Sequence, residues 1–236
     1  MARQAHWVRS AEVKVKDLVN FRTRTASALT VVVAAMSLAA PAQADNLASI
    51  SGGTAVNSIP QGNSGNIVLE QAGIGLAGGQ VWVDGTLDNL GDGVTLTLYQ
   101  VGAESHWRNE IRLGNTSGPK LRDKEDFFRG STGVFTNGPA PFKLIGSVTQ
   151  NSGVANFEFW KMNPDPDTKI VVNGQSPMMM VPEYGYASLA FAYLDDNYQI
   201  VADPTNRILV LLEDGGTDRD YDDYVGILVA TPLPTN

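Results

Sequence analysis

Residues 207–230 read RILVLLEDGGTDRDYDDYVGILVA. Two apolar runs, at 207–212 and 224–229, flank a loop that is rich in acidic residues. Short apolar runs that are bounded by Gly, Asn or Asp are typical of β-strands joined by turns. The stretch therefore predicts two strands with an acidic loop between them near the C-terminus.

The same kind of pattern recurs through the chain that precedes this stretch. Turn markers such as Asp84-Gly85 and Asn173-Gly174 separate short apolar or alternating segments. Only residues 120–129 have the composition of a helical turn. About eight to ten strands in one domain predict an all-β fold, an antiparallel β-sandwich of jelly-roll-like type. The predicted strands before residue 207 are 67–69, 80–83, 94–99, 142–148, 155–160 and 187–193.

The first 44 residues have the three parts of a signal peptide. Six basic and two acidic residues lie within residues 1–24, an uncharged apolar run covers residues 26–40, and Ala42-Gln43-Ala44 follows. The apolar run is shorter than the roughly 20 residues that cross a bilayer as a helix. We therefore expect cleavage after Ala44 and secretion to the extracellular space, with the periplasm in transit. The alternative is an N-terminal membrane anchor; after cleavage no anchor is expected.

Composition divides the remaining chain into three parts. Residues 45–65 are rich in Ser, Gly and Asn, which predicts a flexible leader. Residues 66–232 show no internal repeat or linker and predict one β-sandwich domain. Residues 233–236 are expected to form a short tail.

Charge and cysteine content exclude several classes of function. The 236 residues include no Cys, which excludes disulfides, thiolate zinc sites and cysteine nucleophiles. The formal charge of −8 argues against a nucleic-acid partner, because phosphate binding needs clustered basic residues. Loss of the basic N-terminal segment makes the exported chain still more acidic. Its stability is then expected to come from core burial or from bound ions.

The loop between the two C-terminal strands is the strongest candidate site. Its carboxylates repel one another unless water solvates them or a cation bridges them. Hard oxygen ligands in this number suit Ca²⁺, which takes six to eight oxygens, although the spacing is not that of an EF-hand. A solvated loop and a set of catalytic carboxylates are the alternatives. The candidate ligands are Glu213, Asp214, Asp218, Asp220, Asp222 and Asp223, with Glu213 or Asp214 and the last three preferred.

The pattern E-D-G-G-x-D-x-D-Y-D-D between two apolar strands resembles the closing segment of exported bacterial proteins of the PEP-CTERM (exosortase-sorted) group and related secreted domains. In those proteins a similar stretch is often taken as calcium-binding, and the proteins are associated with extracellular polymer and biofilm matrix. The resemblance is specific over residues 211–228. It implies a calcium-binding extracellular protein whose partners are extracellular polysaccharide or matrix proteins.

The chain departs from that group at its C-terminus. The sorting signal consists of Pro-Glu-Pro, an apolar helix and a terminal Arg cluster, whereas residues 230–236 read ATPLPTN. On this sequence we expect a protein that is released rather than anchored.

Two rival functions stay open beside a non-enzymatic matrix protein with a structural calcium site. A carbohydrate-binding module is the first, with His106, Trp107 and Arg108 as possible ligand-binding residues, because an exposed Trp can stack on a sugar ring. The second is a secreted glycan-active hydrolase that uses paired carboxylates. No G-x-S-x-G elbow accompanies His106. We therefore predict no catalytic residues.

Overall fold

The computed structural model describes residues 46–60, 65–88, 93–105, 109–114, 120–124, 131–134, 142–150, 157–161, 168–172, 180–181, 185–214 and 219–233. The chain divides into two units, Met1–Gln43 and Ala44–Asn236. Every described residue belongs to the second unit. The expected signal peptide, residues 1–44, lies outside the described residues.

The described residues form sixteen strands and one short helix, α1 (Ile67–Ala72). Most of the strands are three to eight residues long, which is usual for antiparallel sheets. The strands are β1 (Ser49–Ser51), β2 (Thr54–Val56), β3 (Val81–Val83), β4 (Thr86–Asp88), β5 (Val94–Ser105), β6 (Asn109–Gly114), β7 (Lys120–Lys124), β8 (Ser131–Val134), β9 (Lys143–Gln150), β10 (Phe157–Lys161), β11 (Thr168–Val172), β12 (Met180–Val181), β13 (Gly185–Leu194), β14 (Ile200–Val201), β15 (Arg207–Asp214) and β16 (Tyr224–Pro232).

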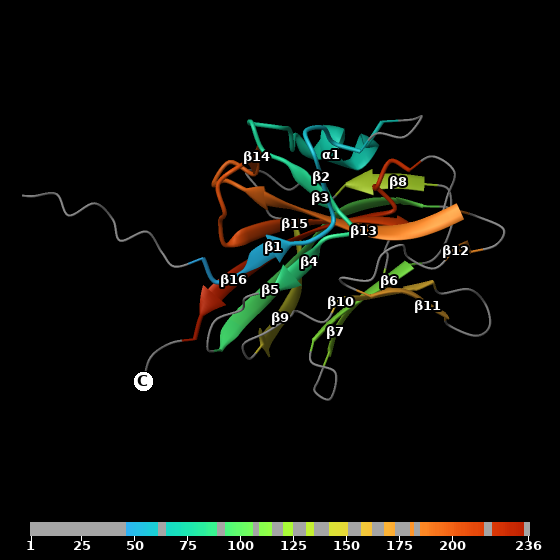
Figure 1. Ribbon diagram of the computed structural model, residues 1–236. Coiled ribbons are helices and arrows are strands. Elements are labelled where there is room, and N and C mark those ends of the chain that lie inside the picture. Colours follow the sequence, from blue (N-terminus) through green and yellow to red (C-terminus); the bar gives the residue numbers. More distant parts are fainter. Residues whose placement is uncertain are drawn as a thin grey trace, which may run out of the picture. The chain divides into compact units, whose positions relative to one another are not determined.

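One large sheet organises the second unit. It has ten strands, with the order β2-β3-β13-β15-β16-β5-β8, and β9, β12 and β14 pair alongside β5 and β13. Every pairing between its strands is antiparallel. Figure 1 shows β15 near the middle of this sheet, with β13 and β16 beside it. The two strands that the C-terminal sequence predicts are therefore central to the fold.

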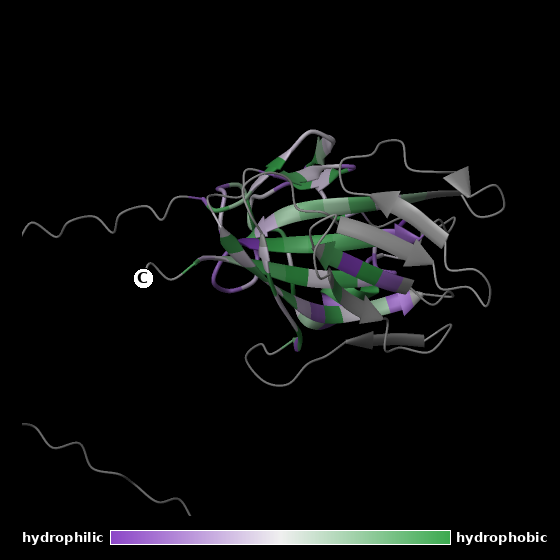
Figure 2. Ribbon diagram, turned by 90° about the horizontal axis from the view of Figure 1, so that it is seen from below, coloured by the Kyte–Doolittle hydropathy of each residue, from purple (hydrophilic) through white to green (hydrophobic). Residues whose placement is uncertain are grey.

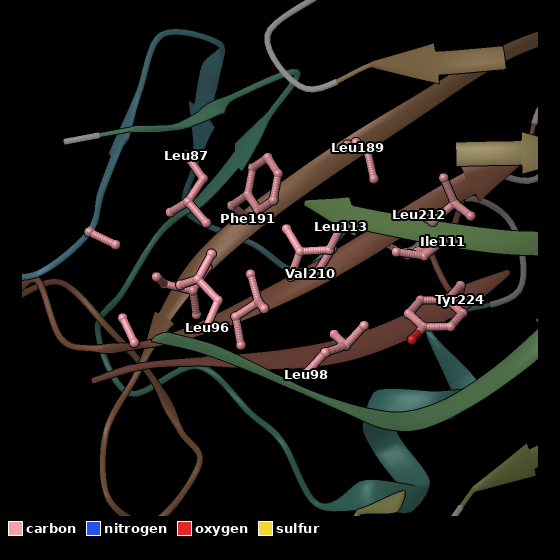
Figure 3. Close-up of a cluster of buried hydrophobic side chains, with 14 of the residues drawn as sticks. Leu87, Leu96, Leu98, Ile111, Leu113, Leu189, Phe191, Val210, Leu212 and Tyr224 are labelled. Atoms are coloured by element: carbon pink, nitrogen blue, oxygen red, sulfur yellow. The ribbon is translucent and has the colours of Figure 1, made fainter. Parts of the chain in front are cut away.

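Two smaller sheets cover one face of the large sheet (Figure 1). The first has the order β11-β10-β6-β7, and the second pairs β1 with β4. Ile111 and Leu113 of β6 and Leu87 of β4 belong to the same buried cluster as alternate residues of β5, β13, β15 and β16. Figure 3 shows Ile111, Leu113 and Leu212 among the side chains of that cluster. Sheet packs against sheet on this face.

The opposite face of the large sheet carries α1 (Figure 1). Val68 and Leu69 of the helix join a second buried cluster with Leu209 and Leu211 of β15. Residues 208–214 are buried without a break, and the side chains of residues 208–212 enter the two clusters alternately. Figure 2 shows the apolar residues along these central strands.

The antiparallel all-β class predicted from the sequence is confirmed, whereas the β-sandwich and its jelly-roll detail stay predictions. The expected number of strands, about eight to ten, is too low for the sixteen among the described residues. Among these residues, no helix is long and apolar enough to cross a membrane.

The strand predicted at residues 67–69 is wrong, since these residues begin α1. Asn66 caps the helix, and its side chain accepts a hydrogen bond from the N–H of Leu69. Gly73 ends the helix in the left-handed region, with φ 72°. An apolar run of three residues is compatible with both strand and helix. Here the capping residues Asn66 and Gly73 favour the helix.

Two further segments differ from their predictions. The expected helical turn at residues 120–129 begins instead with β7, which pairs with β6 along its length and packs Leu121 against the core. The expected flexible leader, residues 45–65, contains β1 and β2, which pair with β4 and β3. The N–H of Ile50 donates to the hydroxyl of Tyr193 at 2.7 Å. Pairing with strands from later in the chain therefore orders β1 and β2, although residues 45–65 have few large apolar side chains.

Candidate metal centre

The candidate centre lies where the β15–β16 hairpin opens. The two strands pair from Arg207↔Val229 to Leu211↔Val225. The antiparallel ladder stops at this pair. Just before β16, Asp222 forms an isolated parallel bridge with Leu212 instead. Arg219 and Tyr221 have positive φ values, 55° and 61°, which ordinary residues adopt rarely outside tight turns. These conformations place residues 219–223, hereafter called the acidic segment, beside the end of β15.

Three carboxylates meet at this point. Glu213, Asp214 and Asp223 each place one carboxylate oxygen within 4.8 Å of the other two. All three residues are buried, with exposed fractions of 1%, 2% and 8%. The backbone N–H of Asp214 donates to Oδ2 of Asp223 at 2.7 Å. This hydrogen bond fixes the Asp223 side chain at the open end of the β15–β16 hairpin. Together these three residues could hold a metal ion.

The electrostatics of Asp223 are those of a crowded, buried carboxylate. Its pKa is raised well above its usual value, first because burial removes water from the charged form. The negative charges of Asp214 and Glu213 raise this pKa further, and Asp220 adds to the effect. The N–H of Asp214 acts in the opposite direction. A proton or a cation bound at this group would relieve both the burial of charge and the repulsion between the carboxylates.

Asp220 and Asp222 form an adjacent buried pair, with exposed fractions of 3% and 0%. Burial and the neighbouring Asp220 raise the pKa of Asp222 to about 8. Oδ2 of Asp222 accepts a hydrogen bond from the N–H of Ile67 at 2.8 Å. Its carbonyl oxygen accepts one from the N–H of Glu104, also at 2.8 Å. Asp222 thus joins β16 to both α1 and β5.

The cap of α1 holds the acidic segment from the other side. The Nδ2 group of Asn66 donates to the carbonyl oxygens of Asp220 and Tyr221, at 2.8 Å and 3.2 Å. Asn66 is 1% exposed, so these hydrogen bonds are shielded from water. One side chain both starts the helix and positions the acidic segment.

A buried hydroxyl network lies beside the carboxylates. The hydroxyl of Tyr221 donates to Oγ of Ser188 at 2.9 Å, and Ser188 donates to Oδ1 of Asp84 at 2.7 Å. Burial raises the pKa of Tyr221 to about 12. Ser188 pairs with Glu213 across β13 and β15. The network anchors the ring of Tyr221 at the position where its backbone adopts a positive φ.

The sequence predicted six ligands in one loop, and the structure divides the described ones into two groups. It brings Glu213, Asp214 and Asp223 together and places Asp220 and Asp222 beside them as a pair. Asp218 lies outside the described residues, as do the possible ligand-binding residues His106, Trp107 and Arg108.

Sequence reasoning missed Asn66 and the backbone N–H of Ile67. An Asn immediately before a short apolar run, with a Gly seven residues later, is a helix-capping signal that could have found α1. Nothing in the sequence indicates that this cap touches the acidic segment, because 154 residues separate Asn66 from Asp220.

A surface pocket of about 390 Å³ lies at the opposite end of β15. Arg207 and Asp196, which both line it, form an ion pair, and Arg207 packs over the ring of Tyr198, with 5.6 Å to the centroid. The acidic turn at Asp195 is closed by hydrogen bonds from the N–H groups of Asn197 and Gln199 to its Oδ1, each at 2.8 Å. This turn is held by its own backbone.

Comparisons with known proteins leave the family open: no model of a known protein family matches this chain, and no curated protein matches it. The resemblance to the PEP-CTERM group therefore stays a prediction that rests on residues 211–228. The interpretation of the site depends on its geometry.

Proposed function

We propose that this protein is a secreted, non-enzymatic, matrix-associated β-protein whose C-terminal hairpin is held by a structural calcium ion. The observation that carries the proposal is the group formed by Glu213, Asp214 and Asp223, with carboxylate oxygens within 4.8 Å of one another. Two oxygens that bind the same Ca²⁺ at about 2.4 Å lie at most about 4.8 Å apart. The cluster therefore meets the distance limit for one shared ion.

The chemistry of the group favours calcium over other metals. All three side chains offer hard oxygen atoms, which suit Ca²⁺ or Mg²⁺ better than the nitrogen and sulfur ligands of zinc sites. Carboxylates and backbone carbonyls can fill the six to eight positions of calcium with flexible geometry, whereas Mg²⁺ demands a near-ideal octahedron and keeps several waters. A site with little exposed surface has less room for such a water shell.

The position of the group supports a structural role. Glu213 and Asp214 end β15, and Asp223 immediately precedes β16. An ion bound here would join two central strands beyond their last paired residues. The chain has no Cys, so an ion would supply a cross-link that extracellular proteins often obtain from disulfides. The secreted location and the matrix partners follow from the N-terminal pattern and the PEP-CTERM resemblance.

Thermal melting with and without calcium tests this proposal. Calcium at about 100 times its Kd stabilises a folded protein by about 2.7 kcal/mol, which for a chain of this size raises Tm by about 5–10 °C. We expect this rise in the wild-type protein and its loss in Asp223→Asn. Asn is isosteric and keeps an oxygen that can accept the N–H of Asp214. Asp203→Asn removes an exposed carboxylate elsewhere and should keep the full rise.

An unchanged Tm in millimolar calcium would overturn the proposal. An equal rise in the wild-type protein and in Asp223→Asn would place the ion elsewhere, and would overturn the assignment of the site.

Carbohydrate binding is the second candidate function, and the pocket beside Arg207 favours it. Arg207, Asn206 and Asp195 line it, and polar side chains of these kinds suit sugar hydroxyl groups. Arg207 also pairs with Asp196, so a sugar would share or displace that pairing. A glycan array tests it: saturable binding that Arg207→Ala abolishes supports this function. Binding that Arg207→Ala leaves intact contradicts this location for it.

A further inference from the structure

Asn66 uses its whole side-chain amide to join two distant segments of the chain. Its Oδ1 accepts a hydrogen bond from the N–H of Leu69 at 2.9 Å and so caps α1. Its Nδ2 donates to the carbonyl oxygens of Asp220 and Tyr221, at 2.8 Å and 3.2 Å. A carboxamide carries both an acceptor and two N–H donors. Ser or Asp can cap a helix equally well, but neither offers two N–H donors.

The backbone that Asn66 holds is strained. Arg219 and Tyr221 have φ values of 55° and 61°, and such a conformation of a non-glycine residue persists only where surrounding contacts hold it. The two carbonyl groups that accept from Asn66 lie in this stretch. Asn66 is 1% exposed, so bulk water cannot replace its donors. Its hydrogen bonds therefore help to fix a conformation that the acidic segment would rarely adopt by itself.

The start of α1 carries this constraint as far as the carboxylate cluster. Oδ2 of Asp222 accepts a hydrogen bond from the N–H of Ile67 at 2.8 Å. Residues 220–222 are thus each hydrogen-bonded to one of the first two residues at the start of the helix. Asp223 follows directly, and its Oδ2 accepts the N–H of Asp214 at 2.7 Å. The position of α1 therefore determines where Asp223 enters the cluster.

We propose that Asn66 is a positioning residue for the calcium site at Glu213, Asp214 and Asp223, so that calcium affinity depends on the docking of α1. The inference rests on the proposed calcium function, because it concerns the same ion and the same carboxylates. The protein already engages the donors and the acceptor of the Asn66 amide, so this residue acts through the backbone of the acidic segment. Preorganisation of that segment tightens binding, because the ion does not have to order it.

The coupling between α1 and the ion is reciprocal. If the hydrogen bonds of Asn66 strengthen calcium binding by some factor, calcium strengthens the docking of the helix start by the same factor. Loss of a group that orients metal ligands typically lowers metal affinity by about 10–100-fold. The effect is therefore large enough to measure from either side.

Titration calorimetry with calcium on the full-length protein tests this role with two variants of α1. Asn66→Ser keeps a good helix cap but lacks the two N–H donors, and we expect its Kd for calcium to rise at least about tenfold. Gly73→Ala weakens the other end of α1, because Gly73 has a φ of 72°, while a Cβ atom there meets nothing within 4 Å. This matched control keeps the contacts of Asn66, so its Kd should stay within about twofold of the wild-type value.

The possible results separate failure of this inference from failure of the proposed function. No calcium binding in the wild-type protein overturns both. Binding by the wild-type protein with an unchanged Kd in Asn66→Ser overturns the role of Asn66 and leaves the calcium site intact. An equal loss of affinity in Asn66→Ser and Gly73→Ala also overturns this role, because the helix would then act only through its stability.

Hydrogen exchange in the wild-type protein keeps the test decisive if Asn66→Ser folds poorly. Saturating calcium should slow exchange of the Ile67 and Leu69 amides, which donate to Asp222 and Asn66, by at least about tenfold. The amide of Gln199, in the turn at the opposite end of β15, should not change. Slower exchange at the Asp214 amide alone, with both α1 amides unchanged, would show that calcium and the helix are not coupled.

Discussion

In the proposed calcium site, Asp223 is the residue whose charge a bound ion would relieve most directly. Its Oδ2 accepts the N–H of Asp214, while burial and the charges of Asp214 and Glu213 raise its pKa. A proton or a cation can relieve the same crowding, so the two compete for the site. Proton binding and calcium binding should therefore depend on each other.

This competition predicts how stability depends on pH. In the metal-free folded protein the pKa of Asp222 is about 8 against an ordinary 3.8, so between these values the folded state holds a proton that the unfolded chain has released. The stabilisation is complete below about pH 4 and is lost as pH rises toward 8. For one such carboxyl the loss is at most about 1.4 kcal/mol per pH unit.

Urea unfolding at pH 5 and pH 8 checks this dependence. In chelator the free energy of unfolding should fall from pH 5 to pH 8, and the fall should be smaller in Asp222→Asn. In calcium the ion replaces the proton, so the stabilisation by calcium should increase over the same range. A protein that becomes more stable between pH 5 and pH 8 in chelator would contradict the electrostatic account.

At the scale of residues, the sequence predicts an acidic site but not which carboxylates meet there. From the sequence alone, six carboxylates in one loop predict that their negative charges repel one another. The meeting of Glu213 and Asp214 could not be predicted, because neighbouring residues of a strand point to opposite faces. The end of the β15–β16 pairing and the positive φ values at Arg219 and Tyr221 decide which oxygens converge.

At the scale of elements, α1 and the acidic segment depend on the same side chain. We expect Asn66→Ala to lower the free energy of unfolding by roughly 2–4 kcal/mol, since it removes a helix cap and two buried hydrogen bonds. Urea unfolding measures the change. Asn57→Ala, which removes one exposed hydrogen bond from Gln80, is the control and should change stability by less than about 1 kcal/mol. If Asn66→Ala lowered the free energy of unfolding no more than Asn57→Ala does, the proposed role of the Asn66 cap would be wrong.

The packing of residues 75–79 against β14 gives a second prediction for an element. A Cβ atom at Gly79 would lie 2.5 Å from the backbone N and C of Val201, whereas at Gly75 it would meet only the side-chain Oε1 of Gln199, at 3.1 Å. We expect Gly79→Ala to cost about 1–3 kcal/mol or more, because backbone must move. Gly75→Ala is the matched control with a smaller cost. The reverse order in thermal melting would contradict this packing.

Strands were predictable where the sequence has an apolar run or alternating apolar residues, and harder to predict where it has neither. The segments at 94–99, 187–193, 207–212 and 224–229 all lie in strands. By contrast, β7 (KLRDK) and β8 (STGV) carry almost no large apolar residues. Their strand conformation comes from pairing with β6 and β5, which is tertiary information that a local pattern does not contain.

At the scale of the whole molecule, the proposed export predicts a defined N-terminus. Mass spectrometry of the exported protein should find a chain that begins at Asp45, because Ala42 and Ala44 provide the small residues of a signal-peptidase site. Replacement of Ala44 by a bulky residue should block the cleavage. An exported protein that retains residues 1–44 would contradict this part of the account.

The large sheet makes the proposed calcium site important to the whole fold. β15 and β16 lie in the middle of the ten-stranded sheet and supply residues to the apolar clusters on both of its faces. Loosening the hairpin at its open end would disturb both clusters. Calcium removal should therefore lower the stability of the second unit as a whole.

A crystal structure of the protein grown with calcium tests the central claim most directly. The account predicts an anomalous peak at which oxygens of Glu213, Asp214 and Asp223 lie about 2.3–2.6 Å from the ion. Carboxyl groups that are hydrogen-bonded to one another, with no peak among them in saturating calcium, would contradict it.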